Sequence, residues 1–342
     1  MRQILLLCIA YSNGLLFNYL NIPAGWIMGS LLIGILYGIV KGEVVFSPVI
    51  FKIGLAFVSA TIGLRIDTNV IQELASVIVP FSLVIVIALF IGTLLSSYLI
   101  KRSTIDPLTS FFSCIPGGAS EVIGLSKDYG ADDRIVAAIH TLRITMFVII
   151  IPFVIKLINP NLTNENLVVS SFEFNQVSFY LIVVLFVILL DRIYHLPGGT
   201  LLYGLVISFL LSNLFPSVML PPNSFVGFGP VIIGLLVGVR FNREVLAQLF
   251  TVGHTIVFIM LAFIMTAFVN AYLFSLVTRL DYSTSLLGTV PAGAAEMAAT
   301  AFSLDISATL IASMHVYRVV FLFIILPFFI KYSKGKWEKS GK

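Results

Sequence analysis

The chain of 342 residues is 59% hydrophobic and only 11% charged, with a mean hydropathy of +1.07. Soluble domains usually carry about 25% charged residues, so this chain has too few polar side chains to cover a globule of its size. These values argue against a soluble enzyme, a DNA-binding regulator and a disordered scaffold, and they predict an integral membrane protein. The formal net charge of +4 is informative through the positions of the basic residues, which set orientation in a membrane.

Ten apolar stretches are long enough, or nearly long enough, to cross a bilayer, and they predict an all-α polytopic membrane protein. Five precede the polar stretch 159–176 and five follow it. The chain is therefore expected to divide into a first membrane repeat at 1–158, an extracytoplasmic loop at 159–176, a second membrane repeat at 177–331 and a basic cytoplasmic tail at 332–342. The expected spans are 4–20, 24–40, 48–64, 76–100 and 134–157, then 177–190, 197–214, 225–239, 252–277 and 306–330.

Two further segments, 110–130 and 283–305, are rich in Gly, Ala, Ser and Pro and too polar for helices that face lipid. Non-helical backbone is tolerated at membrane depth only where protein or a water-filled cavity surrounds it. Each segment is therefore expected to be a broken helix or a re-entrant loop.

Basic residues favour five crossings in each half. If both Gly/Pro-rich segments re-enter, fifteen Lys and Arg residues lie on the cytoplasmic side and three, Arg65, Lys156 and Arg279, lie outside. This distribution agrees with the positive-inside rule. Six crossings in each half would instead put the Lys-rich tail on the same side as the Lys-free loop 159–176. The favoured topology gives two inverted repeats in the cell membrane, with both termini cytoplasmic.

The two halves also match in sequence. Pro116-Gly-Gly-Ala-Ser-Glu121 in the first half corresponds to Pro291-Ala-Gly-Ala-Ala-Glu296 in the second. We call the difference between residue numbers 116 and 291 the repeat offset, and it relates residues well beyond these motifs. Gly/Pro-interrupted segments at equivalent positions of two inverted halves are the sequence pointer to the binding site of a secondary transporter. The other pairs at the repeat offset include His140 and His315, Arg143 and Arg318, Pro152 and Pro327, Lys156 and Lys331, and Arg65 and Arg240.

These motifs, together with Pro23-Ala-Gly-Trp-Ile-Met-Gly29, resemble the AbrB-type integral membrane proteins over nearly the whole chain. That duplicated family is labelled variously as transcriptional regulators or as ammonia monooxygenases. It is similar to the cation:proton antiporter and anion transporter superfamily, so the resemblance implies inverted repeats with crossed, discontinuous helices. The chain departs from a uniform pattern at Ala292, which stands where the first half has Gly117.

Glu121 and Glu296 each follow a glycine by three residues, where a short helix would begin. A carboxylate in a first helical turn is stabilised by free N–H groups and the helix dipole, so capping is one interpretation. A carboxylate at membrane depth is costly and usually functional, so a proton or ion site is the other. The two roles are compatible, and the repeat favours a functional one.

Arg143 lies nine residues beyond Arg134, about 13 Å along a helix, which places it near the middle of the bilayer. His140 is on the same helical face, and the second half repeats this arrangement with His315 and Arg318. One interpretation is that each arginine pairs with the glutamate of the facing segment. The other is that each arginine contributes to an anion site together with helix N-termini and backbone amides.

The sequence offers little support for metal or redox chemistry. It contains four histidines and no H-E-x-x-H pattern, and Cys8 and Cys114 lie far apart. We expect no cofactor, no metal and no enzyme activity. The candidate substrate- or ion-binding residues are Pro116, Gly117, Gly118, Ser120, Glu121, His140, Arg143, Pro291, Gly293, Glu296, His315 and Arg318.

Two functions fit this pattern. The first is a secondary transporter of a small anion or carboxylate, in which the glutamates carry a coupling proton or cation, the arginines bind the substrate charge and the histidines tune both. The second is a membrane sensor that binds a small molecule and influences gene expression through a partner. Direct binding of nucleic acid is disfavoured, because the basic tail is explained as a topology anchor. A homodimer is among the assemblies that the sequence allows.

Overall fold

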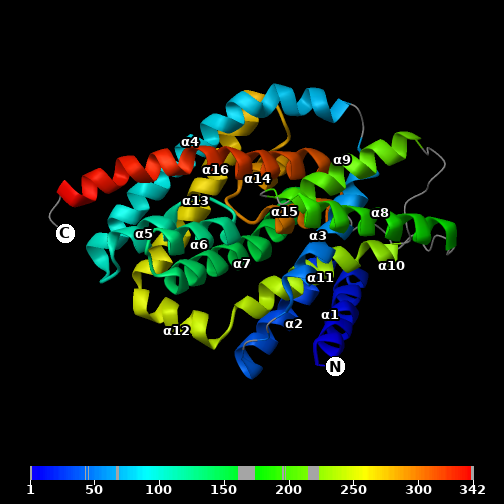
Figure 1. Ribbon diagram of the computed structural model, residues 1–342, viewed down its shortest axis with the longest axis horizontal. Coiled ribbons are helices and arrows are strands. Elements are labelled where there is room, and N and C mark those ends of the chain that lie inside the picture. Colours follow the sequence, from blue (N-terminus) through cyan, green and yellow to red (C-terminus); the bar gives the residue numbers. More distant parts are fainter. Residues whose placement is uncertain are drawn as a thin grey trace.

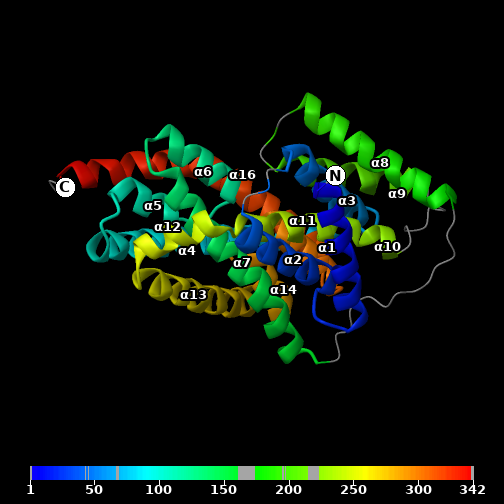
Figure 2. The ribbon, with the colours of Figure 1, turned by 90° about the horizontal axis from the view of Figure 1, so that it is seen from below.

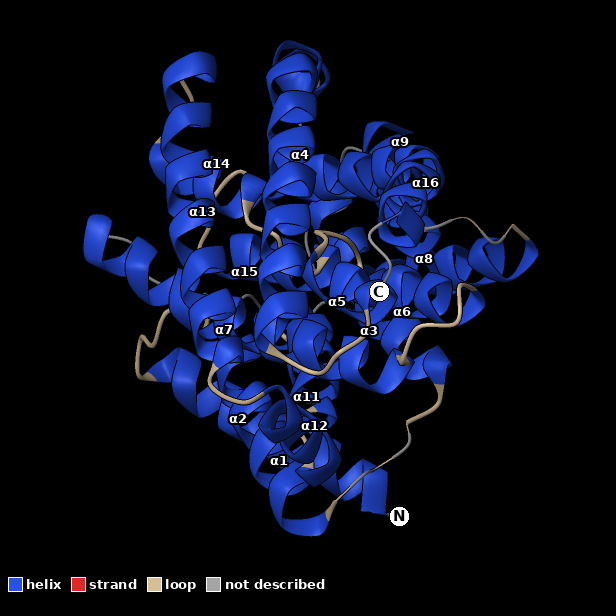
Figure 3. Ribbon diagram, turned by 90° about the vertical axis from the view of Figure 1, so that its left-hand side faces the viewer, coloured by secondary structure: helices blue, strands red, loops and turns tan. Residues whose placement is uncertain are grey.

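In a computed structural model of the chain, the described residues are 2–42, 44, 46–66, 69–160, 174–194, 196, 198–214 and 223–339. The regular elements of this part are all α-helices joined by loops (Figure 3). Five of them, α4, α7, α8, α13 and α16, are long and apolar enough to cross a membrane. Their outer faces carry large exposed apolar side chains, including Leu83, Phe90 and Leu261, which only lipid would solvate well. The chain is a polytopic membrane protein in contact with a bilayer.

Figure 1 shows how the helices are arranged, and their bounds follow here in chain order. The first half comprises α1 (Arg2–Tyr19), α2 (Gly25–Lys41), α3 (Pro48–Gly63), α4 (Asn69–Arg102), α5 (Pro107–Cys114), α6 (Ala119–Asp128) and α7 (Asp133–Ile158). The second half comprises α8 (Phe174–Ile193), α9 (Gly199–Leu214), α10 (Asn223–Val226), α11 (Phe228–Arg240), α12 (Arg243–Val252), α13 (Thr255–Thr278), α14 (Tyr282–Thr289), α15 (Ala294–Ser303) and α16 (Ala308–Lys339).

The repeat offset extends to helix boundaries. Helices α5, α6 and α7 begin at Pro107, Ala119 and Asp133, and α14, α15 and α16 begin at the equivalent positions of the second half. Two elements differ between the halves, because α3 corresponds to two helices, α10 and α11, and the long helix α4 corresponds to α12 and α13. The break between them falls at Gly253, whose φ of 70° is a left-handed conformation that favours glycine.

The helices form two groups, which lie toward opposite ends of the molecule in Figure 2. We call α1, α2, α3, α8, α9, α10 and α11 the scaffold group, and α4–α7 with α12–α16 the break group. Each half of the chain contributes to both groups. An ion pair of 2.6 Å between Lys52 Nζ and Asp191 Oδ2 joins α3 to α8 within the scaffold group. The groups meet where α7, α15 and α16 pack on α2, α3, α9 and α11.

Glycines allow the scaffold helices to cross closely. A Cβ atom at Gly34 would lie 2.5 Å from the carbonyl oxygen of Leu235, and one at Gly238 would collide with that of Leu31. Helices α2 and α11 therefore touch backbone to backbone. The equivalent pair, α9 and α3, crosses where Gly204 faces Ser59. Close crossings at small residues are common in membranes, because packing there replaces the hydrophobic drive between helices.

Several element boundaries differ from those expected. Helix α8 begins at Phe174, inside the stretch 159–176, and residues 161–173 of that stretch lie outside the described residues. The expected span 225–239 is divided into α10 and α11 at Gly227, where a Cβ atom would collide with the Trp26 indole. Helix α16 continues to Lys339, past the expected boundary of the basic tail at 332. Polar residues can extend a helix beyond the apolar segment, which a hydropathy window does not detect.

The α2–α11 crossing should be sensitive to one added methyl group. Gly34→Ala should destabilise the protein by about 1–3 kcal/mol, because the new Cβ meets backbone that cannot rotate away. Gly124→Ala is the matched control, since a Cβ at that helical position meets nothing within 4 Å. It should be neutral or stabilising by up to about 1 kcal/mol. Thermal unfolding in detergent, followed by circular dichroism, measures both; equal effects at the two positions would contradict the close crossing.

Candidate functional site

The site is built around two breaks in the break group. Residues 115–118 separate α5 from α6, and residues 290–293 separate α14 from α15. Pro116 and Pro291 lie in the breaks, and neither has the N–H that a continuing helix would need. Both α5 and α14 begin with an aspartate cap, Asp106 accepting from the N–H of Thr109 at 2.9 Å and Asp281 from that of Thr284 at 2.8 Å. Local sequence signals thus determine where each short helix starts and stops.

The last carbonyls of α5 accept hydrogen bonds from α7. The Nε2 of His140 donates to the Phe112 carbonyl oxygen at 2.9 Å, and Nη1 of Arg143 donates to that of Ile115 at 3.0 Å. Nη2 of Arg143 lies 3.4 Å from the Gly117 carbonyl oxygen and 2.9 Å from Nδ1 of His140. Because Nδ1 accepts from the guanidinium, His140 is the neutral tautomer with its proton on Nε2.

The second half repeats these bonds residue by residue. His315 Nε2 donates to the Leu287 carbonyl oxygen at 2.8 Å, and Nη1 of Arg318 donates to that of Val290 at 2.6 Å. Nη2 of Arg318 donates to the carbonyl oxygen of Ala292. Each acceptor is related to its counterpart in the first half by the repeat offset. The two halves differ at the histidine, because Nδ1 of His315 is buried and makes no hydrogen bond in the described part of the chain.

These donors satisfy the polar backbone that the breaks expose. A helix end leaves carbonyl groups without intrahelical partners, and in a dry interior such groups cost free energy unless they are paired. The arginines are buried, Arg143 being 0% and Arg318 3% exposed. The guanidinium carbon of Arg143 also lies 5.2 Å from the ring centroid of Phe263, in the other half of the chain. The two histidines and two arginines therefore hold the broken helices in place.

This geometry bears on both interpretations of the arginines. Their Nη atoms bond to backbone carbonyls of the break in the same half, an acceptor that neither interpretation included. Arg318 nevertheless interacts electrostatically with both Glu296 and Arg143. The arginines thus give the centre of the molecule a positive charge whether or not they touch a ligand.

Glu296 occupies the third position of α15, after the N-cap residue Gly293. A Cβ atom at Gly293 would collide with the Glu296 carboxylate in its present position, which shows that this side chain folds back over the N-cap. This is the geometry of a capping carboxylate at a helix N-terminus. Glu296 is also only 4% exposed. Ser120 and Glu121 lie in the first turn of α6, and their side chains are outside the described residues.

The difference between Gly117 and Ala292 has a local cause. A Cβ at Gly117 would lie 2.5 Å from Cγ2 of Val122, whose branched side chain has little freedom in a helix. The residue equivalent to Val122 is Met297, which is unbranched at Cβ and can rotate away. The methyl group gained at Ala292 is thus matched by a more adaptable neighbour.

A central cavity of about 90 Å³ brings the two breaks together. It lies between the scaffold group and the break group, and Gly118, Gly293 and Glu296 line it together with Arg240, Phe51 and Leu55. The N-cap positions of α6 and α15 thus meet at one cavity. A second cavity of about 60 Å³ is lined by Pro116, Gly117 and Gly118 and is otherwise apolar. Within the described part of the chain, His140, Arg143, Pro291, His315 and Arg318 line neither cavity.

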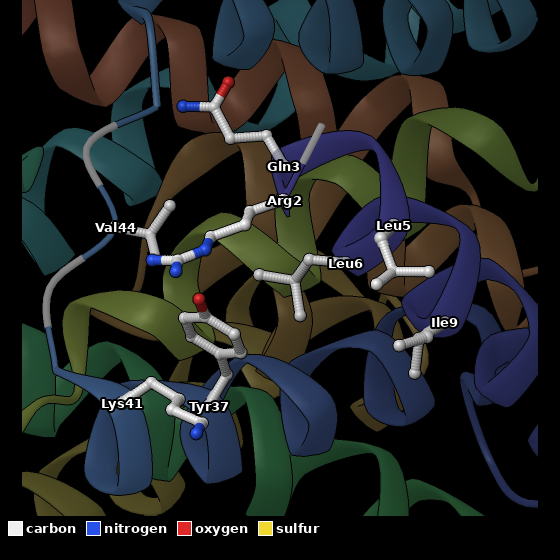
Figure 4. Close-up of a pocket in the computed structure, with 8 residues that line it drawn as sticks. All are labelled: Arg2, Gln3, Leu5, Leu6, Ile9, Tyr37, Lys41 and Val44. Atoms are coloured by element: carbon white, nitrogen blue, oxygen red, sulfur yellow. The ribbon is translucent and has the colours of Figure 1, made fainter.

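A larger cavity of about 620 Å³ lies between the start of α1 and the end of α2, away from the breaks. Figure 4 shows Arg2 and Tyr37 pointing toward one another across it, with Leu6 and Ile9 along its apolar side. None of the candidate residues lines this cavity among the described residues, so we assign the functional site to the central cavity.

Sequence reasoning did not include Arg240 among the candidate residues. Its signal was present, because Gly63-Leu-Arg65 and Gly238-Val-Arg240 keep the repeat offset. Phe51 and Leu55 had no such signal, since a cavity wall of apolar residues looks like any other apolar helix face.

Comparisons with known proteins match one family and two relatives over most of the chain. The family described as "Transition state regulatory protein AbrB" matches residues 26–334. The chain is 21% identical to "Uncharacterized protein YhjN" of Bacillus subtilis (strain 168), covering 97% of this chain and 93% of that protein. It is 23% identical to "Putative regulator AbrB" of Escherichia coli (strain K12), covering 91% of this chain and 90% of that protein.

Removing either arginine should destabilise the fold. Arg143→Met and Arg318→Met each leave buried carbonyls without a donor, at about 1–3 kcal/mol for each stranded group. Lysine should restore only part of the loss, because it lacks the planar fork that reaches two carbonyls. Arg192→Gln, which neutralises an exposed arginine on α8, is the control and should change stability little. Melting temperatures in detergent measure the effect, and wild-type melting of Arg143→Met would refute the bracing role.

Proposed function

Because this chain belongs to the AbrB family and encloses a cavity at which two helix N-termini meet, we propose that it is a secondary transporter of a small anion or carboxylate. That cavity is the observation on which the proposal depends. Free N–H groups and the positive end of the helix dipole favour an anion at each helix N-terminus. Arg240 in the cavity wall and the buried charges of Arg143 and Arg318 would add to this potential.

Glu296 supplies the coupling in this proposal. Its carboxylate lies at the same cavity, so an anion bound there would be repelled by the ionised form. A proton or cation that neutralises Glu296 removes this repulsion. Anion and coupling ion would then bind more tightly together than apart, which is what coupled transport requires. We assign the same role to Glu121, the equivalent residue of the first half, and the bracing of the breaks to His140, Arg143, His315 and Arg318.

The two helix groups would provide alternating access. The central cavity lies at their interface, so a shift of the break group against the scaffold group could open it to one side and then to the other. We propose that the two halves are inverted in the cytoplasmic membrane, that the two broken segments re-enter, and that both termini are cytoplasmic. The proposal involves no chemical reaction, cofactor or metal.

The competing function is that of a membrane regulator. It is favoured by the word "regulator" in the name of the Escherichia coli relative. A regulator would bind a small molecule at the same cavity and act on gene expression through a partner protein. Binding would then occur without flux, which separates the two functions.

Purified protein in liposomes tests the transport function. Labelled lactate, succinate, citrate and sulfate should be offered with an imposed pH or Na⁺ gradient. Saturable uptake of at least one anion, dissipated by a protonophore or by collapse of the Na⁺ gradient, would support a coupled transporter. Saturable binding without uptake would support the regulator, and uptake equal to that of empty liposomes for all four anions would contradict anion transport.

Glu296→Gln should abolish gradient-driven uptake and leave a stably folded protein. Glutamine can cap the first turn of α15 as glutamate does, but it cannot carry the charge that couples the two ligands. Asp128→Asn, at the exposed end of α6, removes one carboxylate far from the cavity and should transport normally. If Glu296→Gln melts well below the wild type, the carboxylate has a structural role instead.

Cysteine labelling tests the inverted topology. In a Cys8→Ser background, a cysteine at Asn164 should react with an impermeant thiol reagent from outside intact cells, and a cysteine at Lys101 should react only after permeabilisation. Cys114 is fully buried and should not contribute. Labelling of both positions from one side would exclude the proposed topology.

A further inference from the structure

Two more cavities occupy equivalent positions in the two halves. The first, of about 390 Å³, is lined by Arg240, Val245 and Gln248 beside the start of α7, and we call it the Arg240 cavity. The second, of about 290 Å³, is lined by Arg65, Val70 and Glu73 beside the start of α16, and we call it the Arg65 cavity. The repeat offset relates the members of each of these three pairs. The repeat has thus produced two openings of the same design.

The two cavities lie on opposite sides of the molecule. The Arg65 cavity includes the first turns of α4, which run along the top in Figure 1, and the Arg240 cavity includes α12, which lies along the bottom. Both are formed by helix ends rather than by lipid-facing helix centres. This is where the two aqueous entrances of a transporter would lie.

Counted over the described residues, the net charges of the side chains that line the two cavities are opposite in sign. The Arg240 cavity is lined by two arginines, Arg134 and Arg240, and one carboxylate, Glu244. The Arg65 cavity is lined by one arginine and two carboxylates, Glu73 and Asp305. The substitution of Glu73 in one half by Gln248 in the other accounts for one unit of this difference. Arg240 and Arg65 each face an aromatic ring. The guanidinium carbon of Arg240 lies 5.7 Å from the ring centroid of Phe51, and that of Arg65 lies 4.9 Å from the ring centroid of Phe302.

Arg240 connects its cavity to the central one. It lines both the Arg240 cavity and the central cavity, and Phe51, the ring it faces, lines the central cavity as well. The lining of the central cavity, among the described residues, includes no equivalent contribution from Arg65. An anion entering beside Arg240 would therefore meet the guanidinium before it reached the N-termini of α6 and α15.

Resting on the proposed transport function, we propose that the Arg240 cavity is the entrance that receives the anion. Arg240 attracts the anion there and passes it to the central cavity. In the Arg65 cavity, Glu73 and Asp305 offset the charge of Arg65, so that side has the lower affinity for the anion. The difference between position 73 and its equivalent, 248, would then contribute to the side preference.

Fluorescence quenching measures the charge of each cavity without knowledge of the substrate. In a Cys8→Ser background, a fluorophore is attached to the cysteine of Val245→Cys or of Val70→Cys. Its quenching is measured at low ionic strength with iodide, with thallium(I) and with neutral acrylamide, each used separately. Because acrylamide is uncharged, its quenching measures only how accessible the fluorophore is, and it serves as the reference for both ions. Relative to acrylamide, iodide should quench more strongly at position 245 and thallium more strongly at position 70. One unit charge at about 8 Å in water should change the local concentration of each ion roughly twofold.

Charge exchanges supply the matched variants. Gln248→Glu should lower iodide quenching at position 245, and Glu73→Gln should raise it at position 70, each about twofold. Arg240→Gln should lower iodide quenching at position 245. It should also raise the KM for labelled succinate or sulfate more from that side of oriented liposomes than from the other, because Arg240 also lines the central cavity. Arg65→Gln is the matched control: it removes the equivalent arginine from the cavity on the opposite side, so it should lower iodide quenching at position 70 instead of position 245.

The outcomes separate this inference from the transport function. Equal quenching at both positions, or quenching unchanged by the charge exchanges, would overturn the inference. Uptake with a KM that Arg240→Gln does not alter would overturn the inference and leave the transporter intact. Absence of uptake in wild-type protein would overturn both.

Discussion

The structure depends on how two interrupted helices are stabilised inside a membrane protein. Each break leaves carbonyl groups that no water can reach, and each is braced by a histidine and an arginine from the crossing helix. The donors His140 and Arg143 are three residues apart, as are their acceptors Phe112 and Ile115. One helical turn of donors thus matches one helical turn of acceptors, which explains the His-x-x-Arg motif in physical terms.

This bracing has an electrostatic consequence. The two guanidinium groups that satisfy carbonyls keep their charges, and the charge of Arg318 interacts with those of Arg143 and Glu296. Burying charge is costly unless hydrogen bonds and opposite charge compensate it. The carbonyls supply the hydrogen bonds, and Glu296 supplies opposite charge to one arginine. A further anion would add compensation, so the structural role of the arginines favours an anion at the interface instead of competing with it.

Much of this could be predicted from the sequence. Hydropathy indicated the membrane class, and the repeat offset located both breaks and both His-x-x-Arg motifs, because rare residues kept in register report shared backbone geometry. The carbonyl acceptors could not be predicted, since backbone atoms carry no residue signature. Nor could the division into two helix groups, which depends on contacts between α2 and α11 that glycines permit but do not specify. The break at Gly253 was missed because Gly253 and His254 lie at the start of the expected span 252–277, where a hydropathy window does not resolve a short interruption.

The positions at which the two halves have different residues are also informative. A perfectly repeated and inverted protein would present the same surface to both sides of a membrane, so any side preference must come from residues at which the halves differ. Some differences are compensated locally, as Ala292 is by Met297. Others are not: His315 lacks the guanidinium contact that His140 makes, and Glu73 faces a cavity whose counterpart has Gln248. Because bracing of the breaks is preserved in both halves, these uncompensated positions are free to make the two equivalent cavities unequal.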